Sequence, residues 1–191
     1  MTSEAHDTAA GEFNKHLIAK LTQMNVVNDI SSRHSALKRL GNVSKQLDGA
    51  WGPMVPQRYA TCVLEVGRSE SEKQLLLDAR IWLELPQSPQ CNIHQVITIK
   101  IHQDRIIFQM WEKSGRAYGR TRADHPQRAQ KTQEVQVSRL NNVPVAAGSF
   151  RVSFSKLFEG SPTPGTAETD IIFTAEDLNA IAGEVWLPRD T

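Results

Sequence analysis

Cysteines and long apolar runs, which stabilise many extracellular and membrane proteins, are scarce in this sequence. The chain has only two cysteines, Cys62 and Cys91, too few for a disulfide framework. Its longest apolar runs, such as Leu75–Leu77, are far shorter than the roughly 20 residues needed to cross a membrane. The first residues, MTSEAHDTAAGEF, are polar and acidic, unlike the apolar core of a secretory signal. These absences predict a soluble, cytoplasmic protein.

Recognisable metal and catalytic motifs are also absent. No two of the histidines have the spacing of metal ligands on a helix, and the cysteines form no C-x-x-C pair. The sequence contains neither a G-x-S-x-G nucleophile motif nor a phosphate-binding G-K-[ST] loop. Cys91 lies three residues before His94, but catalytic pairs are set by the fold rather than by such spacing. We therefore predict no catalytic residue, metal or cofactor.

What the sequence does contain is a change of apolar period along its 191 residues. Residues 1–11 are small and polar and predict a disordered tail. Residues 12–48 predict two amphipathic helices, and residues 49–57, rich in glycine and proline, predict a linker. Residues 58–191 predict an antiparallel β-rich domain. The two helices are inferred from apolar stripes, the second weakened by Gly41: Phe13, Leu17, Leu21 and Met24, then Ala36, Leu37, Leu40, Val43 and Leu47.

Beyond residue 58 the apolar residues alternate, as in strands. Cys62, Leu64 and Val66 would share one face of a first strand, and the alternating residues of Ala79–Leu85 would form a second. Further strands are predicted at Glu134–Leu140, Ser149–Phe158 and Asp170–Phe173. Thr174 has the features of a helix N-cap, opening a short helix that ends before Gly183 and is followed by an extended strap, EVWLP.

A hairpin at residues 96–111 is the best-specified unit. With a turn at Gln103-Asp104, one face pairs Ile101 with Ile106, Ile99 with Phe108 and Ile97 with Met110. The other face pairs Lys100 with Ile107, Thr98 with Gln109 and Val96 with Trp111. A slip of one residue would bury Lys100 and expose the isoleucines, so the pattern favours this register.

The predicted fold class is therefore α+β. We expect an antiparallel sheet or sandwich of about 5–7 strands, two N-terminal amphipathic helices and a short C-terminal helix. No βαβ alternation is visible, which disfavours a doubly wound nucleotide-binding fold.

Charge is distributed unevenly along the chain. The net charge is only +1, but residues 113–156 carry nine basic side chains against two acidic ones, a local net charge of +7. Residues 157–191 carry one basic side chain against seven acidic ones, a local net charge of −6. Such asymmetry bears on partners and association rather than on fold.

The basic block is the candidate binding site. Arginine forks suit phosphate oxygens, aromatic rings can stack on unpaired bases, and Gly115 and Gly119 would let the backbone approach a ligand. Single-stranded nucleic acid or an acidic membrane surface would both be served, and a solvated loop is the simpler alternative. The predicted residues are Trp111, Lys113, Arg116, Tyr118, Arg120, Arg122, Arg128 and Lys131.

The acidic block is the candidate self-association surface. Its predicted residues are Glu168, Asp170, Glu176 and Asp177, which could meet the basic block of a second copy. The alternative is that the acidic end folds onto its own chain.

The sequence thus predicts a non-enzymatic assembly protein, a homo-oligomer that presents a basic face to nucleic acid or an acidic membrane. A viral or phage structural (matrix-like) subunit would fit, by fold-level analogy alone. The second hypothesis is a nucleic-acid-binding protein that does not polymerise, and the third is an enzyme of unrecognised type.

Overall fold

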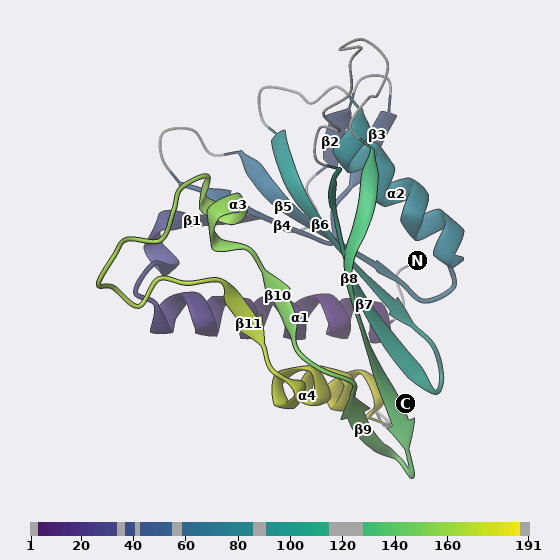
Figure 1. Ribbon diagram of the computed structural model, residues 1–191. Helices are drawn as coiled ribbons and strands as arrows, with labels where there is room; N and C mark the ends of the chain where they lie inside the picture. Colours follow the sequence, from purple (N-terminus) through teal and green to yellow (C-terminus); the bar gives the residue numbers. More distant parts are fainter. Residues whose placement is uncertain are drawn as a thin grey trace, which may run out of the picture.

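A single seven-stranded sheet organises the protein. The computed structural model describes residues 4–33, 37–40, 43–54, 59–85, 91–114 and 128–187. Within them the strands follow the order β1-β4-β5-β6-β7-β8-β9 (Figure 1). Their bounds are β1 Ile30–Arg33, β4 Gly49–Pro53, β5 Ala60–Gly67, β6 Cys91–Ile101, β7 Arg105–Lys113, β8 Ala129–Leu140 and β9 Val143–Ala146.

The predicted α+β class is confirmed, but the sheet is mixed rather than purely antiparallel. Strands β5 and β6 are parallel, while every other neighbouring pair in this sheet is antiparallel. Helix α2 (Glu72–Glu84) makes the crossover between β5 and β6. A βαβ unit is therefore present where the alternation predicted none, because parallel neighbours can only be joined by such a crossover.

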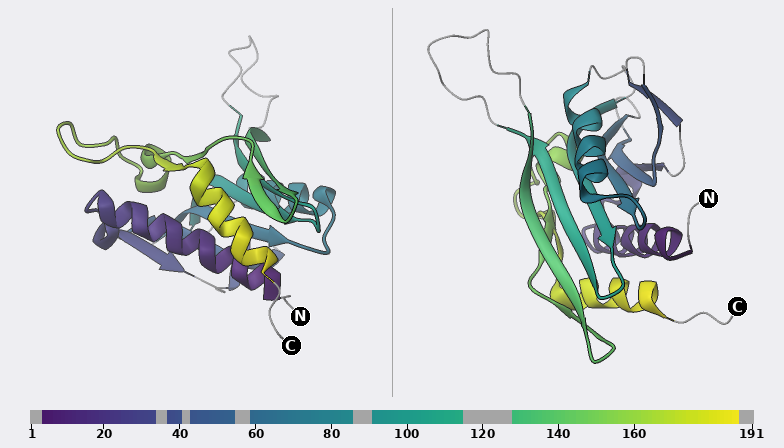
Figure 2. Two further views of the ribbon diagram at one scale, coloured as in Figure 1. Left: turned by 90° about the horizontal axis from the view of Figure 1, so that it is seen from below. Right: turned by 90° about the vertical axis from the view of Figure 1, so that its right-hand side faces the viewer.

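Two apolar cores lie on the two faces of the sheet. The larger core packs under α1 (Glu4–Gln23), α4 (Ala175–Trp186) and the small ribbon of β10 (Phe150–Val152) with β11 (Ile171–Phe173). The smaller core packs under α2. Figure 2 shows α1 and α4 side by side and α2 on the other side of the sheet. Strand β5 is buried along its whole length because both layers cover it.

Helix α1 confirms the first predicted apolar stripe and extends it. Phe13 and Leu17 are fully buried, and the Phe13 ring stacks on Phe173 with 4.4 Å between ring centroids. The predicted disordered tail is wrong for residues 4–11, which are helical. Ala9 is also fully buried, one helical turn before Phe13, so the small residues of this segment fit close under the sheet layer.

The second predicted helix is wrong, because residues 37–40 and 43–46 form two paired strands. Strand β2 (Leu37–Leu40) pairs antiparallel with β3 (Val43–Gln46). The intervening Gly41-Asn42 weakens a helix and is typical of hairpin turns, a signal that outweighs the short apolar stripe. The predicted linker also contains structure, since residues 49–53 form β4 in the main sheet.

The second predicted strand is helix α2. Ser71 caps this helix, its side chain accepting a hydrogen bond from the backbone N–H of Gln74. Leu75, Ala79 and Trp82 are buried on one side, at the spacing of a helical stripe. Residues 79–85 satisfy both periods over so short a run, and packing against the sheet selects the helix.

The predicted hairpin is confirmed at all six cross-strand pairs. Strands β6 and β7 align in the expected register, including Ile99 with Phe108 and Lys100 with Ile107. The isoleucine face contributes to the larger core. The register is the predicted one, but the opposite face is buried as well: Thr98 is fully buried and Lys100 is 7% exposed, where the pattern predicted a solvated lysine.

The C-terminal part differs in its element boundaries. The predicted strand 149–158 divides into β10 and helix α3 (Phe154–Phe158). Thr174 is the N-cap of α4 and forms a reciprocal capping box with Asp177. Helix α4 continues through Gly183 to Trp186, so the predicted strap is helical there. None of the helices in the described ranges is long and apolar enough to cross a membrane.

Candidate functional site

The basic residues that the structure describes flank the connection between β7 and β8. The Ser114 N–H donates to the Arg128 carbonyl (2.8 Å), and the Arg128 N–H donates to the Ser114 hydroxyl (3.1 Å). These bonds bring the ends of the connection together at one end of the sheet. Lys113 and Arg128 are therefore neighbours, whereas the predicted residues Arg116, Tyr118, Arg120 and Arg122 lie outside the described residues.

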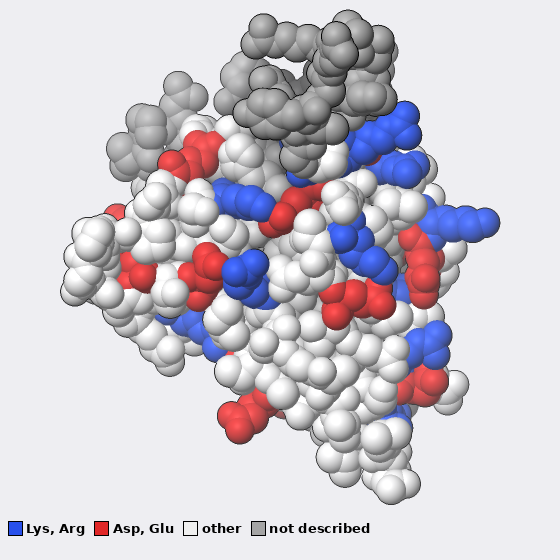
Figure 3. Space-filling view, in the orientation of Figure 1, with Lys and Arg blue, Asp and Glu red and all other residues white. Residues whose placement is uncertain are grey.

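Two of the predicted residues have other partners. The Trp111 side chain is half-buried against the smaller core, and its indole N–H donates to the Thr98 hydroxyl (3.0 Å). Lys131 forms an ion pair with Glu134. On the face of the molecule drawn in Figure 3, lysine and arginine side chains are interspersed with acidic ones. The described part alone is therefore not a uniformly basic surface.

Three of the four acidic residues predicted for self-association have hydrogen-bond or ion-pair partners within their own chain. Asp177 caps α4 and pairs with Lys20 of α1 (2.7 Å). Burial by itself raises the pKa of Asp177, but the hydrogen bonds from Lys20 and Thr174 outweigh it and hold that pKa below its usual value.

The next two acidic residues also have partners. Asp170 accepts from the Phe154 N–H (2.9 Å) and pairs with Arg151 (3.2 Å). Glu168 accepts from the Thr163 N–H (2.6 Å). Glu176 lies in the first turn of α4, where a carboxylate favours the helix dipole. The acidic residues therefore stabilise the fold of their own chain.

A polar row crosses the sheet beneath α2, at positions that were expected to be core or solvated face. Glu65, Thr98 and Gln109 are buried on neighbouring strands, with Glu65 opposite Thr98 and Thr98 opposite Gln109. Glu65 accepts from the Trp82 indole N–H (2.5 Å), and Gln109 donates to Glu134 (2.9 Å). Burying such groups is costly unless they are paired, so the row is a specified feature of the fold.

Asp48 lies beside Glu65 at the edge of this row. It immediately precedes β4, whose first residue, Gly49, pairs with Leu64, and its Oδ2 accepts from the Val66 N–H (2.8 Å). The His6 ring of α1 lies 3.2 Å from the same carboxylate. The hydrogen bond to Asp48 is the largest influence on His6 and raises its pKa to about 9.

Lys100 places a buried ammonium group two positions beyond Thr98 on the same face. It is 7% exposed, and its Nζ donates to the backbone carbonyls of Arg68 (2.7 Å) and Glu70 (2.5 Å). Burial lowers its pKa. Gly67 lies opposite Lys100, and an added Cβ there would lie 2.7 Å from the Glu70 carboxylate.

A second polar cluster surrounds Glu159 at the C-terminus of α3. His94 Nε2 lies 2.6 Å from its carboxylate, Asn92 donates to it at 2.5 Å, and the Tyr59 hydroxyl also donates to it. Burial alone raises the pKa of Glu159, but the bonds from Tyr59 and His94 prevail and lower it. The cluster links three segments of the chain, and His94 is a partner of a carboxylate rather than of Cys91, whose side chain lies outside the described structure.

Sequence reasoning missed Glu65, Asp48 and His6. The only local signal was a charge inside an otherwise apolar strand, as in CVLEVG, which strand periodicity assigns to a solvated face. The crossover that places α2 over that face is a tertiary feature. Among the described residues, no group of three or more histidine, cysteine or acidic side chains is arranged to hold a metal ion.

Comparisons with known proteins do not assign the chain to a family. No family model, no curated protein and no solved structure matches the chain.

Proposed function

We propose that the protein binds single-stranded nucleic acid through the basic residues at the β7–β8 end of the sheet, in the cytoplasm. The observation that carries the proposal is the pair of hydrogen bonds between Ser114 and Arg128. They close the connection at its base, so Lys113 and Arg128, the described basic residues at its two ends, lie together at one end of the sheet. Lysine and arginine at such density neutralise successive backbone phosphates.

The geometry favours the hypothesis without polymerisation. Head-to-tail assembly would need acidic side chains free to meet a second copy. Asp177, Asp170 and Glu168 instead make hydrogen bonds or ion pairs within the chain. Breaking these contacts would destabilise the packing of α4, α3 and the adjoining loop, so self-association through this surface would compete with folding.

The test is a salt series of binding measurements. We expect fluorescence anisotropy of a labelled single-stranded oligonucleotide to give an affinity that falls steeply with salt. Replacing Arg116, Arg120 and Arg122 with glutamine should lower the slope of log K against log salt by up to about 2, because each single-strand phosphate contact contributes roughly 0.7.

A matched triple variant is the control. It carries glutamine in place of Lys15, Lys73 and Arg105, and so loses the same charge at positions away from the β7–β8 end. We expect the slope of log K against log salt for this variant to match that of the wild type. Equal slopes in the two triple variants would contradict the proposal. A different result would assign the site to a membrane: no binding of nucleic acid, together with binding to phosphatidylserine vesicles that only the arginine variant loses. Growth of particle mass at low salt in light scattering would restore the assembly hypothesis.

The polar row favours a second candidate function, phosphodiester hydrolysis. Asp48 precedes β4 and its Oδ2 accepts from the N–H of Val66, the residue after Glu65, so the two carboxylates belong to adjoining backbone positions. Mg²⁺ is commonly held by one or two carboxylates together with the phosphates of its substrate. Lys100 is covered by the Arg68–Glu70 turn, so it would contribute a positive field to this face without contacting the phosphate.

This second candidate predicts Mg²⁺-dependent cleavage of an oligonucleotide. Glu65→Gln keeps an acceptor for the Trp82 indole N–H but removes the charge, so it should keep the fold and lose the cleavage by about 100-fold or more. Glu70→Gln, which changes a neighbouring exposed carboxylate, is the control and should retain cleavage. Gel assays with and without chelator measure the activity. Cleavage that persists in Glu65→Gln, or none in the wild type, would reject hydrolysis while leaving the binding proposal intact.

A further inference from the structure

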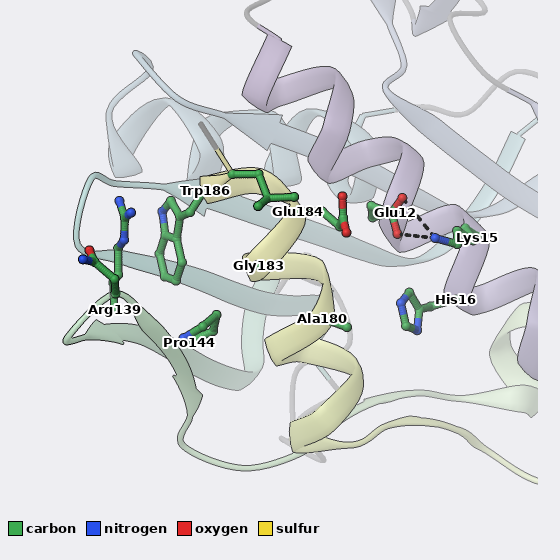
Figure 4. A pocket seen from close by; sticks show the side chains of 11 residues that line it. Glu12, Lys15, His16, Arg139, Pro144, Ala180, Gly183, Glu184 and Trp186 are labelled. Carbon is green, nitrogen blue, oxygen red and sulfur yellow. Dashed lines mark hydrogen bonds and ion pairs between the residues drawn. The ribbon is translucent and has the colours of Figure 1, made fainter. Parts of the chain in front are cut away.

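A groove of about 610 Å³ lies between α1, α4 and the β8–β9 hairpin. Figure 4 shows side chains from all three elements around it, with Arg139, Trp186 and Pro144 at one end and Glu184, Glu12 and Lys15 at the other. Its volume is in the range of pockets that hold small organic ligands. It belongs to neither site described above, since Arg139 lies eight residues along β8 from Lys131, on the order of 26 Å.

Arg139 is the unusual residue of the groove. Its Nε is buried and has no hydrogen-bond partner among the described residues. None of the ion pairs in the described structure involves its guanidinium. The buried Nε–H without an acceptor is costly and is closed to a ligand, so the groove can be reached only by the other guanidinium nitrogens, for which a carboxylate is the best-matched acceptor.

Trp186 holds the guanidinium in place. The Arg139 guanidinium carbon lies 5.8 Å from the centroid of the Trp186 ring. The indole N–H donates to the His102 carbonyl (3.3 Å), which fixes the ring relative to the sheet. Pro144, opposite Arg139 on β9, adds a second rigid apolar wall. The charged group is thus presented beside a preformed apolar surface.

Gly183 keeps the groove open. It lies inside α4, where a glycine is less favourable than alanine by roughly 1 kcal/mol. It lines the groove, and the nearest atom to an added Cβ would be Pro144 Cγ at 3.9 Å. The helix therefore does not need the glycine for packing, but a large side chain at this position would fill the groove.

The far wall carries two acidic side chains, Glu12 and Glu184, against one lysine, Lys15, and so disfavours a second negative group on the ligand. Glu12 pairs with Lys15 (2.9 Å), and Glu184 lies beside them in the lining. These carboxylates would repel a second anionic group that reached past Trp186. A polyanion such as nucleic acid does not fit this arrangement.

We propose that this groove binds a small organic carboxylate, with its carboxylate on Arg139 and its apolar body along Trp186, Pro144 and Leu187. The matched probes are 3-phenylpropionate and its amide, 3-phenylpropanamide, which differ in charge but hardly in shape. We expect the carboxylate to shift the Trp186 indole N–H signal in ¹H–¹⁵N spectra and to bind at least 10-fold more tightly than the amide. The signal is assigned from its absence in Trp186→Phe.

Three variants decide the outcome. Arg139→Gln should reduce the affinity for the carboxylate to that for the amide, and Gly183→Leu should abolish binding of both. Arg151→Gln, at an exposed arginine paired with Asp170, should change neither. Retained spectra outside the groove show that each variant is folded. Equal affinities of the two probes, binding unaffected by Arg139→Gln or Gly183→Leu, or no shift at about 20 mM carboxylate would overturn the proposal.

Discussion

Some charged residues of this protein lie within apolar stretches of the sequence. Glu65 stands within a fully buried strand, and Lys100 stands within a run of isoleucines. Each is tolerated because it has partners at hydrogen-bonding distance: the Trp82 indole for the glutamate and two backbone carbonyls for the lysine. Residues held in this way mark functional sites as often as structural ones.

His6 predicts a pH dependence of stability. Its pKa is about 9 in the folded protein against 6.5 when unperturbed, so its contribution is complete below pH 6.5 and is lost as pH rises through 9. Urea unfolding at pH 6 and pH 9.5 should show a loss larger in the wild type than in His6→Gln by about 1–2 kcal/mol, after allowance for solvent screening. Lys15→Gln, at an exposed pair, should behave as the wild type. Equal losses in wild type and His6→Gln would contradict the assignment.

At the scale of elements, glycines separate positions that close packing requires from positions that stay open. An added Cβ at Gly52 in β4 would lie 1.9 Å from the Tyr59 carbonyl oxygen, so only glycine fits there. At Gly183 the same atom would meet nothing closer than 3.9 Å. The two glycines look alike in the sequence and have opposite roles in the structure.

This contrast predicts changes of opposite sign. Gly183→Ala should raise the free energy of unfolding by about 0.5–1 kcal/mol, because alanine favours the helix and finds open space. Gly52→Ala should lower it by about 2–3 kcal/mol through overpacking against backbone. Chemical denaturation of both variants measures the two changes. A destabilised Gly183→Ala would mean that α4 packs more tightly on β9 than the structure shows.

For the molecule as a whole, helix α1 joins distant segments into one core. Phe13 stacks on Phe173 and lies 6.0 Å from the Trp51 ring, centroid to centroid. Lys20 and His16 reach Asp177 on α4. The first helix and the last thus close over the same sheet face (Figure 2).

Phe13→Ala is expected to destabilise the whole molecule by about 3–5 kcal/mol. Circular dichroism and tryptophan fluorescence should lose signal together during urea unfolding, because α1 shares its core with β4, β5 and α4. Phe158→Ala, at a half-buried ring stacked on Phe154, should cost less and serves as the comparison. Separate transitions by the two probes would show that α1 unfolds independently.

The sequence by itself determined the elements whose pattern is strong over many residues. The β6–β7 register, the α1 stripe and the Thr174 cap follow from local burial and hydrogen bonding, and all three are confirmed. Short runs were ambiguous: residues 79–85 fit a strand or a helix, and only packing on the sheet selected α2. The sequence shows the chain length and the charge blocks, but it does not show which charged side chains form ion pairs.

The candidate sites depended on tertiary structure for the same reason. Glu65, Thr98 and Gln109 are far apart in sequence and lie side by side only because β5, β6 and β7 are neighbours in the sheet. The groove at Arg139 exists because α1 and α4, the first helix and the last, pack beside β8 and β9. Periodicity reports which face of an element is apolar, whereas the neighbour that covers this face is decided by the packing of the whole chain.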